Sequence, residues 1–205
     1  MVQRLRKSGI RDARVLEAMG EVPRHVFVAR ENRASAYQDT EVGSDQGEVV
    51  LSPQAVALML QALSPPRKGR VLEVGVRSGY ETALLAELSD QVFAVESNRK
   101  VADAAKQRLI GLGYKRVQVQ ARKGLGGCSE TAPFDAILVT FPVERFPQTL
   151  LEQVGEGGRL VFALGAGPEQ TLNRVEKVDG RVRSEIVATG RMLPASEAGK
   201  PKRPR

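Results

Sequence analysis

The chain has 205 residues, of which 41% are hydrophobic and 27% are charged, the ordinary balance of a globular protein. This composition excludes collagen-like, disordered and disulfide-scaffold proteins, and the apolar runs are too short to cross a bilayer. Charges interrupt the N-terminal stretch where a signal peptide needs an apolar core. The single cysteine, Cys128, can form neither an internal disulfide nor, by itself, a metal site. We therefore expect a cytoplasmic protein with no membrane partner and no metal.

The formal net charge is +7, from 31 Lys and Arg against 24 Asp and Glu. The last eleven residues carry four of these cations and one glutamate, a net +3, which leaves +4 spread over the body. Aromatic side chains are 4% and tryptophan is absent, so the chain offers no stacking platform for single strands. This pattern argues against a nucleic-acid partner. It indicates one domain over residues 1–194 and a disordered basic tail over 195–205.

The first third of the chain is predicted to be helical and irregular. Asp12 can cap a helix that Pro23 ends, with apolar positions at helical spacing at Val15, Leu16 and Met19. His25 has no partner base or metal in the sequence, so we expect it to pack against the end of that helix. Residues 37–53 combine acidic side chains with glycines and are predicted to form a loop. A second helix over 53–63 follows, with one apolar face made by Val56, Met59, Leu60 and Leu63.

The middle of the chain alternates short β-branched runs with helical stretches. The predicted strands are residues 70–75, 91–96, 116–121, 134–140 and 158–165, and the predicted helices are residues 81–88, 98–113 and 145–154. Alternation at this spacing predicts crossover units and a mostly parallel α/β sheet with helices on both faces. Asp179-Gly180 lies between two further β-type runs, which predicts an antiparallel hairpin at one edge of the sheet.

The first strand ends in a loop with the composition of a nucleotide-type binding site. In open α/β sheets, ligands bind beyond the carboxyl ends of the strands. Here that end is the run Glu73, Gly75, Arg77, Ser78, Gly79 and Tyr80. Glu96 ends the second strand about twenty residues later, where a carboxylate can accept hydrogen bonds from a ribose diol. A glycine loop followed by such an acid is common to nicotinamide and S-adenosylmethionine binders.

Longer motifs make the comparison more specific. GIRDARVLEAM, VPRHVFV, AYQDT, SPQAVALM, VLEVGxxSGY, APFDAILVT, LLEQV and GGRLV follow in the order and spacing of bacterial protein-L-isoaspartate O-methyltransferases. The chain resembles this family over residues 1 to about 194. The resemblance implies a Rossmann-like class I S-adenosylmethionine-dependent methyltransferase fold with seven strands. Residues 1–65 would then form an N-terminal helical segment and substrate loop, and residues 66–194 the core.

By the same resemblance, the parent reaction transfers a methyl group from S-adenosylmethionine to the α-carboxyl of isoaspartyl residues in damaged proteins. The implied cofactor-binding positions are Glu73, Gly75, Arg77, Ser78, Gly79, Tyr80, Glu96, Lys123 and Gly124. Two of them depart from the family. Arg77 replaces the middle glycine of Gly-x-Gly-x-Gly, and Lys123 replaces an aspartate that faces the adenine amino group. A lysine has no acceptor lone pair, so we expect both changes to impair cofactor binding.

The catalytic segment departs as well. The two hydroxyl positions of the family are Val49 and Leu51 here, and Ser52, one residue away, is the candidate catalytic residue. After the fourth strand of the core, Phe141-Pro142 is bulkier than the family's pair of alanines. Intact scaffold motifs beside an altered pocket predict a family member with impaired or lost cofactor binding and catalysis.

Two alternatives remain open. The first is a working repair enzyme, with isoaspartyl proteins or peptides as substrates and Ser52 replacing the missing hydroxyl. The second is a non-enzymatic interaction domain with an unidentified protein partner, or a binder of an anionic ligand, because Arg77, Arg122 and Lys123 make the old pocket more positive. For the altered pocket we expect the guanidinium of Arg77 to form an ion pair with Glu96. We expect the protein to be a monomer.

Overall fold

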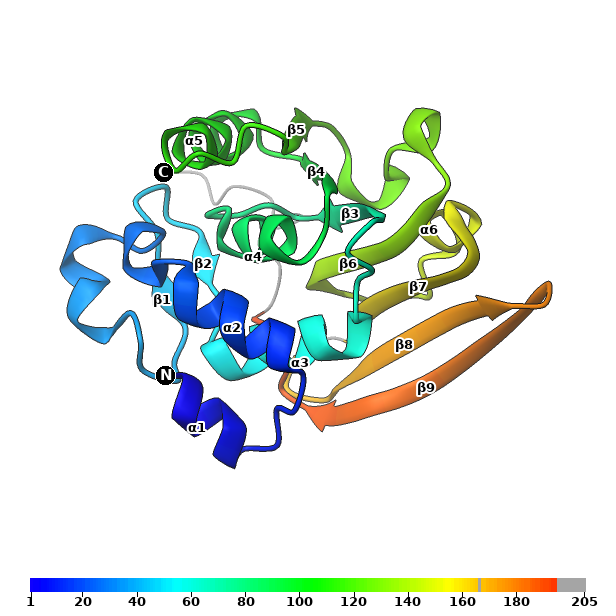
Figure 1. The fold of residues 1–205 in the computed structure, drawn as a ribbon, viewed down its shortest axis with the longest axis horizontal. Coiled ribbons are helices and arrows are strands. Elements are labelled where there is room, and N and C mark those ends of the chain that lie inside the picture. The colour runs from blue at the N-terminus through cyan, green and yellow to red at the C-terminus, as the bar shows by residue number, and fades with distance from the viewer. Residues whose placement is uncertain (166, 195–205) are drawn as a thin grey trace.

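The computed structural model describes residues 1–165 and 167–194, so the predicted basic tail lies outside the described residues. Figure 1 shows a sheet with helices packed against it and a long hairpin at one edge. The helices are α1 (Val2–Lys7), α2 (Ala13–Glu21), α3 (Pro53–Leu63), α4 (Tyr80–Leu88), α5 (Arg99–Gly111) and α6 (Gln148–Glu152). The strands are β1 (Val42–Gly43), β2 (Val49–Val50), β3 (Arg70–Val74), β4 (Gln91–Glu96), β5 (Gln118–Ala121), β6 (Phe134–Val143), β7 (Val154–Leu164), β8 (Gln170–Val178) and β9 (Arg181–Gly190).

The main sheet has seven strands in the order β5-β4-β3-β6-β7-β8-β9. The pairs among β5, β4, β3, β6 and β7 are parallel, and β8 and β9 add antiparallel. This confirms the predicted mostly parallel α/β sheet and the edge hairpin, and β3, the first core strand, lies in the interior of the sheet. Strand β6 continues past its predicted end because Pro142 and Val143 pair with β7, and β7 begins earlier than predicted, where Val154 pairs with Phe134.

The two faces of the sheet are covered unequally. One face packs on α3, α4 and α5 through a core that includes Val71, Ala94 and Leu138. The other face packs on the short helix α6, through Leu150 and Leu151, and on the segment that contains Cys128. The N-terminal helices lie outside the first layer, with α2 beside both α3 and α4 (Figure 1). Among the described residues, the second face is therefore covered by less helix than the first.

Local sequence signals explain where the N-terminal helices begin. The side chain of Asp12 accepts hydrogen bonds from the backbone N–H groups of Arg14 and Val15, which caps α2 as predicted. Helix α2 ends at Glu21, two residues before Pro23. The predicted apolar face of α3 is buried. His25 contacts Tyr37, with 2.7 Å between its Nδ1 and the phenol oxygen.

Residues 37–53 are not only a loop, which corrects the sequence prediction. Strands β1 and β2 form a two-residue antiparallel pair, Val42 with Val50 and Gly43 with Val49. The pairing is short, so its sequence signal is weak. The turn between them is closed by Ser44, whose backbone N–H donates to the carbonyl of Glu48 at 2.8 Å. This ribbon (residues 42–50) lies over the carboxyl ends of β3 and β4 through contacts described below. In the described part of the chain, no helix is long and apolar enough to cross a membrane.

Candidate functional site

The candidate site lies where the predicted glycine loop follows β3. Gly75 and Gly79 have φ angles of 98° and 88°, a region that favours glycine. A Cβ atom on Gly75 would lie 2.5 Å from Oγ1 of Thr140, so the chains approach too closely there for any side chain. Gly79 precedes α4 and brings that helix against α5. The conformation and packing of the loop thus require glycine at both of these positions.

Arg77, between these glycines, also has a positive φ of 51°. Its side chain is 8% exposed, and its Nη1 donates to the carbonyl oxygen of Val49 at 3.3 Å. The predicted ion pair with Glu96 is therefore wrong, because the guanidinium is directed to the ribbon instead. It is the backbone N–H of Arg77 that donates to Oε2 of Glu96, at 3.3 Å. The buried side chain of Arg77 thus joins the loop to the ribbon.

Glu96, the predicted ribose acceptor, is 8% exposed and already bonded. Its Oε1 accepts from the backbone N–H of Asn98 at 2.9 Å and from the hydroxyl of Ser97 at 3.2 Å. Together with the Arg77 N–H, three donors occupy the carboxylate. The structure brings Glu96 to the glycine loop as predicted, with its oxygens engaged by the protein itself.

An aromatic ring lies between the loop after β3 and the turn after β5. The ring of Phe141, in β6, is near both Gly75 and Gly124: Cβ atoms built on these glycines would lie 2.8 Å and 3.6 Å from it. Thr140 fixes this part of β6, because its hydroxyl donates to the carbonyl oxygen of Gly75 at 2.5 Å. The sequence marks Phe141 as bulky, but its packing between two glycines follows only from the register of β6 on β3.

The two cations after β5, Arg122 and Lys123, have different surroundings. Lys123 is exposed at the start of a short turn, Gly124–Gly126. Arg122 forms an ion pair with Glu130 at 2.6 Å, which lowers the pKa of that glutamate to about 2. Its Nη1 also lies 3.7 Å from Sγ of the buried Cys128. Arg122 is therefore part of a surface contact with the following loop.

The candidate catalytic segment begins α3. Oγ of Ser52 accepts from the backbone N–H of Ala55 at 3.3 Å, so this hydroxyl caps the helix. Leu51 is fully buried in the core and Val49 is half-buried in β2. The backbone of Val49, the side chain of Leu51 and the hydroxyl of Ser52 each have a structural role in this segment.

Beneath the loop lies a group of buried polar side chains. Tyr80, predicted to contact a cofactor, is fully buried against the ring of Phe27, and the guanidinium of Arg24 lies 4.9 Å from its ring centre. Arg24 itself is fully buried and donates to the carbonyls of Ala36 and Leu51, both at 2.6 Å. Tyr80 therefore faces the N-terminal segment. Sequence reasoning missed Arg24, which no periodic pattern distinguishes from a surface arginine.

Two carboxyl groups share this interior. Burial raises the pKa of Glu73 well above its usual range, and the nearby Glu81 adds to the rise. The hydroxyl of Thr82 donates to Oε2 of Glu73 at 2.5 Å. Burial also raises the pKa of Glu81, which the cations Arg24 and Arg77 lower in part. Both side chains lie below the backbone of the loop.

Arg108, in α5, is a second contact between the core and the ribbon that the sequence did not reveal. Its Nη1 donates to the carbonyl oxygen of Ser78 at 2.8 Å, and its Nη2 donates to Oε1 of Gln46 at 3.1 Å. The carboxylate of Asp45 lies 4.0 Å away. Arg77 and Arg108 thus hold the ribbon over the glycine loop from two elements.

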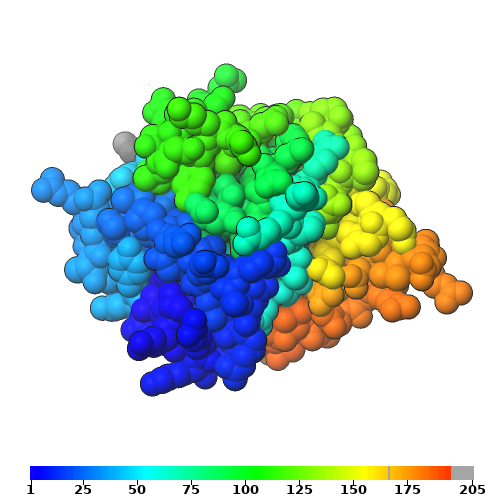
Figure 2. Space-filling model, viewed as in Figure 1, coloured from blue at the N-terminus to red at the C-terminus, as the bar shows by residue number. Residues whose placement is uncertain are grey.

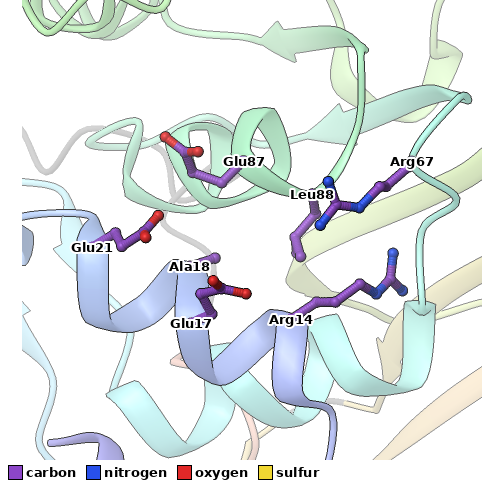
Figure 3. Close-up of a pocket in the computed structure, with 7 residues that line it drawn as sticks. All are labelled: Arg14, Glu17, Ala18, Glu21, Arg67, Glu87 and Leu88. Carbon is purple, nitrogen blue, oxygen red and sulfur yellow. The ribbon is translucent and has the colours of Figure 1, made fainter.

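Two cavities among the described residues lie away from this loop. One of about 180 Å³ lies between α2 and α4. Figure 3 shows Arg14 and Arg67 at one end of it and Glu21 and Glu87 at the other. A second cavity of about 70 Å³ lies between α1 and the start of α3. Neither is lined by a residue of the glycine loop.

Comparison with known proteins identifies the scaffold. The family described as protein-L-isoaspartate(D-aspartate) O-methyltransferase matches residues 1–200. A protein-L-isoaspartate O-methyltransferase of Hahella chejuensis is 40% identical over 195 residues, which are 95% of this chain and 92% of that protein. One from Alkalilimnicola ehrlichii is 42% identical over 198 residues, 95% of this chain and 89% of that protein.

Solved structures of similar fold lead to the same family. A protein-L-isoaspartate O-methyltransferase superimposes with a TM-score of 0.80 and 26% identity, covering 95% of this chain and 64% of that one. A Plasmodium falciparum protein described as a putative protein-L-isoaspartate O-methyltransferase in complex with S-adenosyl-L-homocysteine has a TM-score of 0.76 at 22% identity. The match covers 90% of this chain and 91% of that one, and shows the shared fold. The chain therefore belongs to the protein-L-isoaspartate O-methyltransferase family.

Proposed function

We propose that this chain keeps the scaffold of its family but has impaired or lost S-adenosylmethionine binding and methyl transfer. The observation that carries the proposal is the packing of Phe141 between Gly75 and Gly124, the two glycines where the family resemblance expects the cofactor. A cofactor in that place would have to displace the ring from an apolar contact into water. Removing apolar area from such a contact costs about 25 cal/mol per Å².

Arg77 and Glu96 support the same proposal. The resemblance implies bare backbone at position 77, whereas a buried arginine side chain stands there and bonds Val49. The carboxylate of Glu96 already accepts three hydrogen bonds from the protein. A ribose diol would have to compete with these donors for the same oxygens.

Lys123 and the segment 49–52 weaken the site further. The ammonium of Lys123 can only donate, so an adenine amino group at this position would find a donor instead of an acceptor. The two hydroxyl positions of the family are aliphatic here, and the Ser52 hydroxyl caps α3. Positioning of a substrate carboxylate by hydrogen bonds is thereby weakened, and positioning is a large part of enzymatic rate enhancement. We propose a cytoplasmic location on the composition alone.

Calorimetric titration of the purified protein with S-adenosylmethionine and S-adenosylhomocysteine tests the proposal. We expect no saturable heat with either compound, and no label transferred from S-adenosylmethionine to an isoaspartyl peptide. The H. chejuensis relative, treated in the same way in the same buffer, is the positive control for both compounds and for the peptide. Saturable binding together with methylation of the peptide would establish a working repair enzyme instead, and Ser52→Ala would then be the next variant.

A further inference from the structure

Strand β9 is the last strand of the sheet, and its outer edge carries no other strand in the described part of the chain. Residues 181–186 are exposed, including the apolar Val182 and Ile186 at 53% and 61%. The β8–β9 hairpin extends away from the body, at the right of Figures 1 and 2. A long exposed edge with apolar side chains is a template for pairing with another strand.

The turn of the hairpin determines which backbone groups face outward. Asp179 and Gly180 both have positive φ angles, 53° and 69°, as in a two-residue type I′ turn. The flanking pair Val178–Arg181 is then a hydrogen-bonded pair, and such pairs alternate along an antiparallel ladder. Residues 181, 183 and 185 therefore bond toward β8. The N–H and C=O groups of residues 182, 184 and 186 point outward.

From this edge we propose that two copies of the chain associate through β9, antiparallel about a two-fold axis at Ser184. In this register Ser184 pairs with Ser184 of the second copy, and Val182 pairs with Ile186 on both sides. All of these residues carry outward N–H and C=O groups, so the backbone pairing is satisfied. Their side chains lie on the same face of the sheet as Val175, the residue opposite Ser184 in β8. This is the face that α6 covers only in part.

The charges of β9 fit the same register. Arg183 comes opposite Glu185 of the second copy, twice per dimer because the interface is symmetric. These are non-hydrogen-bonded pairs of the new ladder, in which side chains approach most closely. Glu185 has 61% side-chain exposure beside its contact with Arg174 at 3.2 Å, so its carboxylate can accept a further cation.

Neighbouring registers lack this complementarity. An axis at residue 183 or 185 places Arg183 opposite Arg183, or Glu185 opposite Glu185. An axis at Val182 places Arg181 opposite Arg183, and an axis at Ile186 leaves Glu185 opposite Val187. Like charges directly opposite each other destabilise a strand pair. Ser184 is thus the centre that pairs both the charges and the apolar side chains. The result is a dimer with one continuous sheet, in place of the monomer expected from the sequence.

Light scattering coupled to size exclusion, over a dilution series of the full chain, tests the association. We expect a species of twice the 22.3 kDa chain mass that dissociates on dilution. Arg183→Glu and Glu185→Arg each place like charges opposite one another in their own homodimers, so each variant should be monomeric. Arg181→Glu makes the same charge change two residues away on β9. In the proposed register this position lies opposite Val187 of the second copy, so the variant should remain a dimer.

Mixing the two monomeric variants gives the decisive result. In the mixed dimer, the glutamate introduced at position 183 of one copy faces the arginine introduced at position 185 of the other. On the opposite side of the axis the unchanged Glu185 faces the unchanged Arg183, so both ion pairs return. We expect the equimolar mixture to form a dimer, with circular dichroism showing that each variant alone is folded.

Three results would overturn the proposal. The first is a wild-type chain that stays monomeric at every concentration. The second is a dimer that survives Arg183→Glu, since the new ladder would then not depend on the charge pairs. The third is a pair of folded variants that remain monomeric when mixed.

Discussion

The backbone N–H of Arg77 lies 3.3 Å from Oε2 of Glu96, so the glycine loop and the acid at the end of β4 are bonded to each other. In a site open to a ligand, both groups could bond to the ligand. Here they bond to each other, the Arg77 side chain is bonded to Val49, and the ring of Phe141 packs against Gly75. The contact links the two features from which the sequence predicts a nucleotide-type site.

Two substitutions of Arg77 distinguish the effect of its backbone strain on stability from the effect of its side-chain contacts. Both Arg77→Gly and Arg77→Ala lose the hydrogen bond to Val49, but only glycine relieves the left-handed conformation. We expect Arg77→Gly to be more stable than Arg77→Ala by about 1 kcal/mol. Urea denaturation of the two variants measures this difference. Equal stabilities would mean that the loop changes its conformation once the guanidinium is gone.

Cofactor binding should require the removal of Phe141 as well as the two cations. From sequence alone, Arg77→Gly with Lys123→Asp is expected to restore binding. With the ring packed between Gly75 and Gly124, we expect saturable S-adenosylhomocysteine binding only when Phe141→Ala is added. Calorimetry on the double and triple variants tests this. A matched triple variant with Phe146→Ala, which removes a ring that packs on Phe162, should bind no better than the double variant.

The sheet and the glycine loop were predictable from sequence, and the side-chain contacts of the site were not. The alternation of strands and helices was sufficient to predict the sheet, because periodicity and turn residues act locally. The glycine loop and Glu96 were found for the same reason. The direction of the Arg77 side chain was predicted wrongly, since it depends on the ribbon that residues 42–50 form. The contacts of Arg24 and Arg108 depend on chain segments far apart in sequence, which no local pattern encodes.

Restoring the two hydroxyls of the family should have unequal effects on stability. Leu51 is fully buried, so Leu51→Ser leaves a cavity and a buried hydroxyl. We expect it to lower the free energy of unfolding by about 3–5 kcal/mol. Val49 is half-buried, so Val49→Thr should cost less than about 1 kcal/mol. Thermal denaturation compares them. A Leu51→Ser variant as stable as Val49→Thr would contradict the observed burial.

Ser52 should contribute to the stability of the protein as the N-cap of α3. Because its Oγ accepts from the backbone N–H of Ala55, Ser52→Ala should destabilise the protein by about 1 kcal/mol. Ser52→Asp keeps an acceptor at the N-terminus of α3 and should retain most of the stability. Chemical denaturation of both variants gives the result. If alanine and aspartate were equally destabilising, the loss would not come from the cap.

Glu81 should make stability depend on pH. Burial raises its pKa above the ordinary 4.5, so the folded state binds the proton more tightly than the unfolded state. The resulting stabilisation is fully present below pH 4.5 and is lost as the pH rises through the raised value. Glu81→Gln should therefore be more stable than the wild type at neutral pH, with a difference that shrinks toward pH 4.5.

Urea denaturation at a series of pH values measures this difference. The matched control is Glu17→Gln, the same substitution at an exposed position of α2. A constant difference between Glu81→Gln and the wild type across the series would argue against a buried titrating carboxyl.

The hydrogen bond from Arg77 to residue 49 ends on a main-chain carbonyl, an atom that every amino acid carries. The side chain at position 49 can therefore be exchanged while the loop stays joined to the ribbon. Substitutions at position 49 therefore leave this hydrogen bond intact, and the backbone of the ribbon stays bonded to the loop whichever side chain stands there.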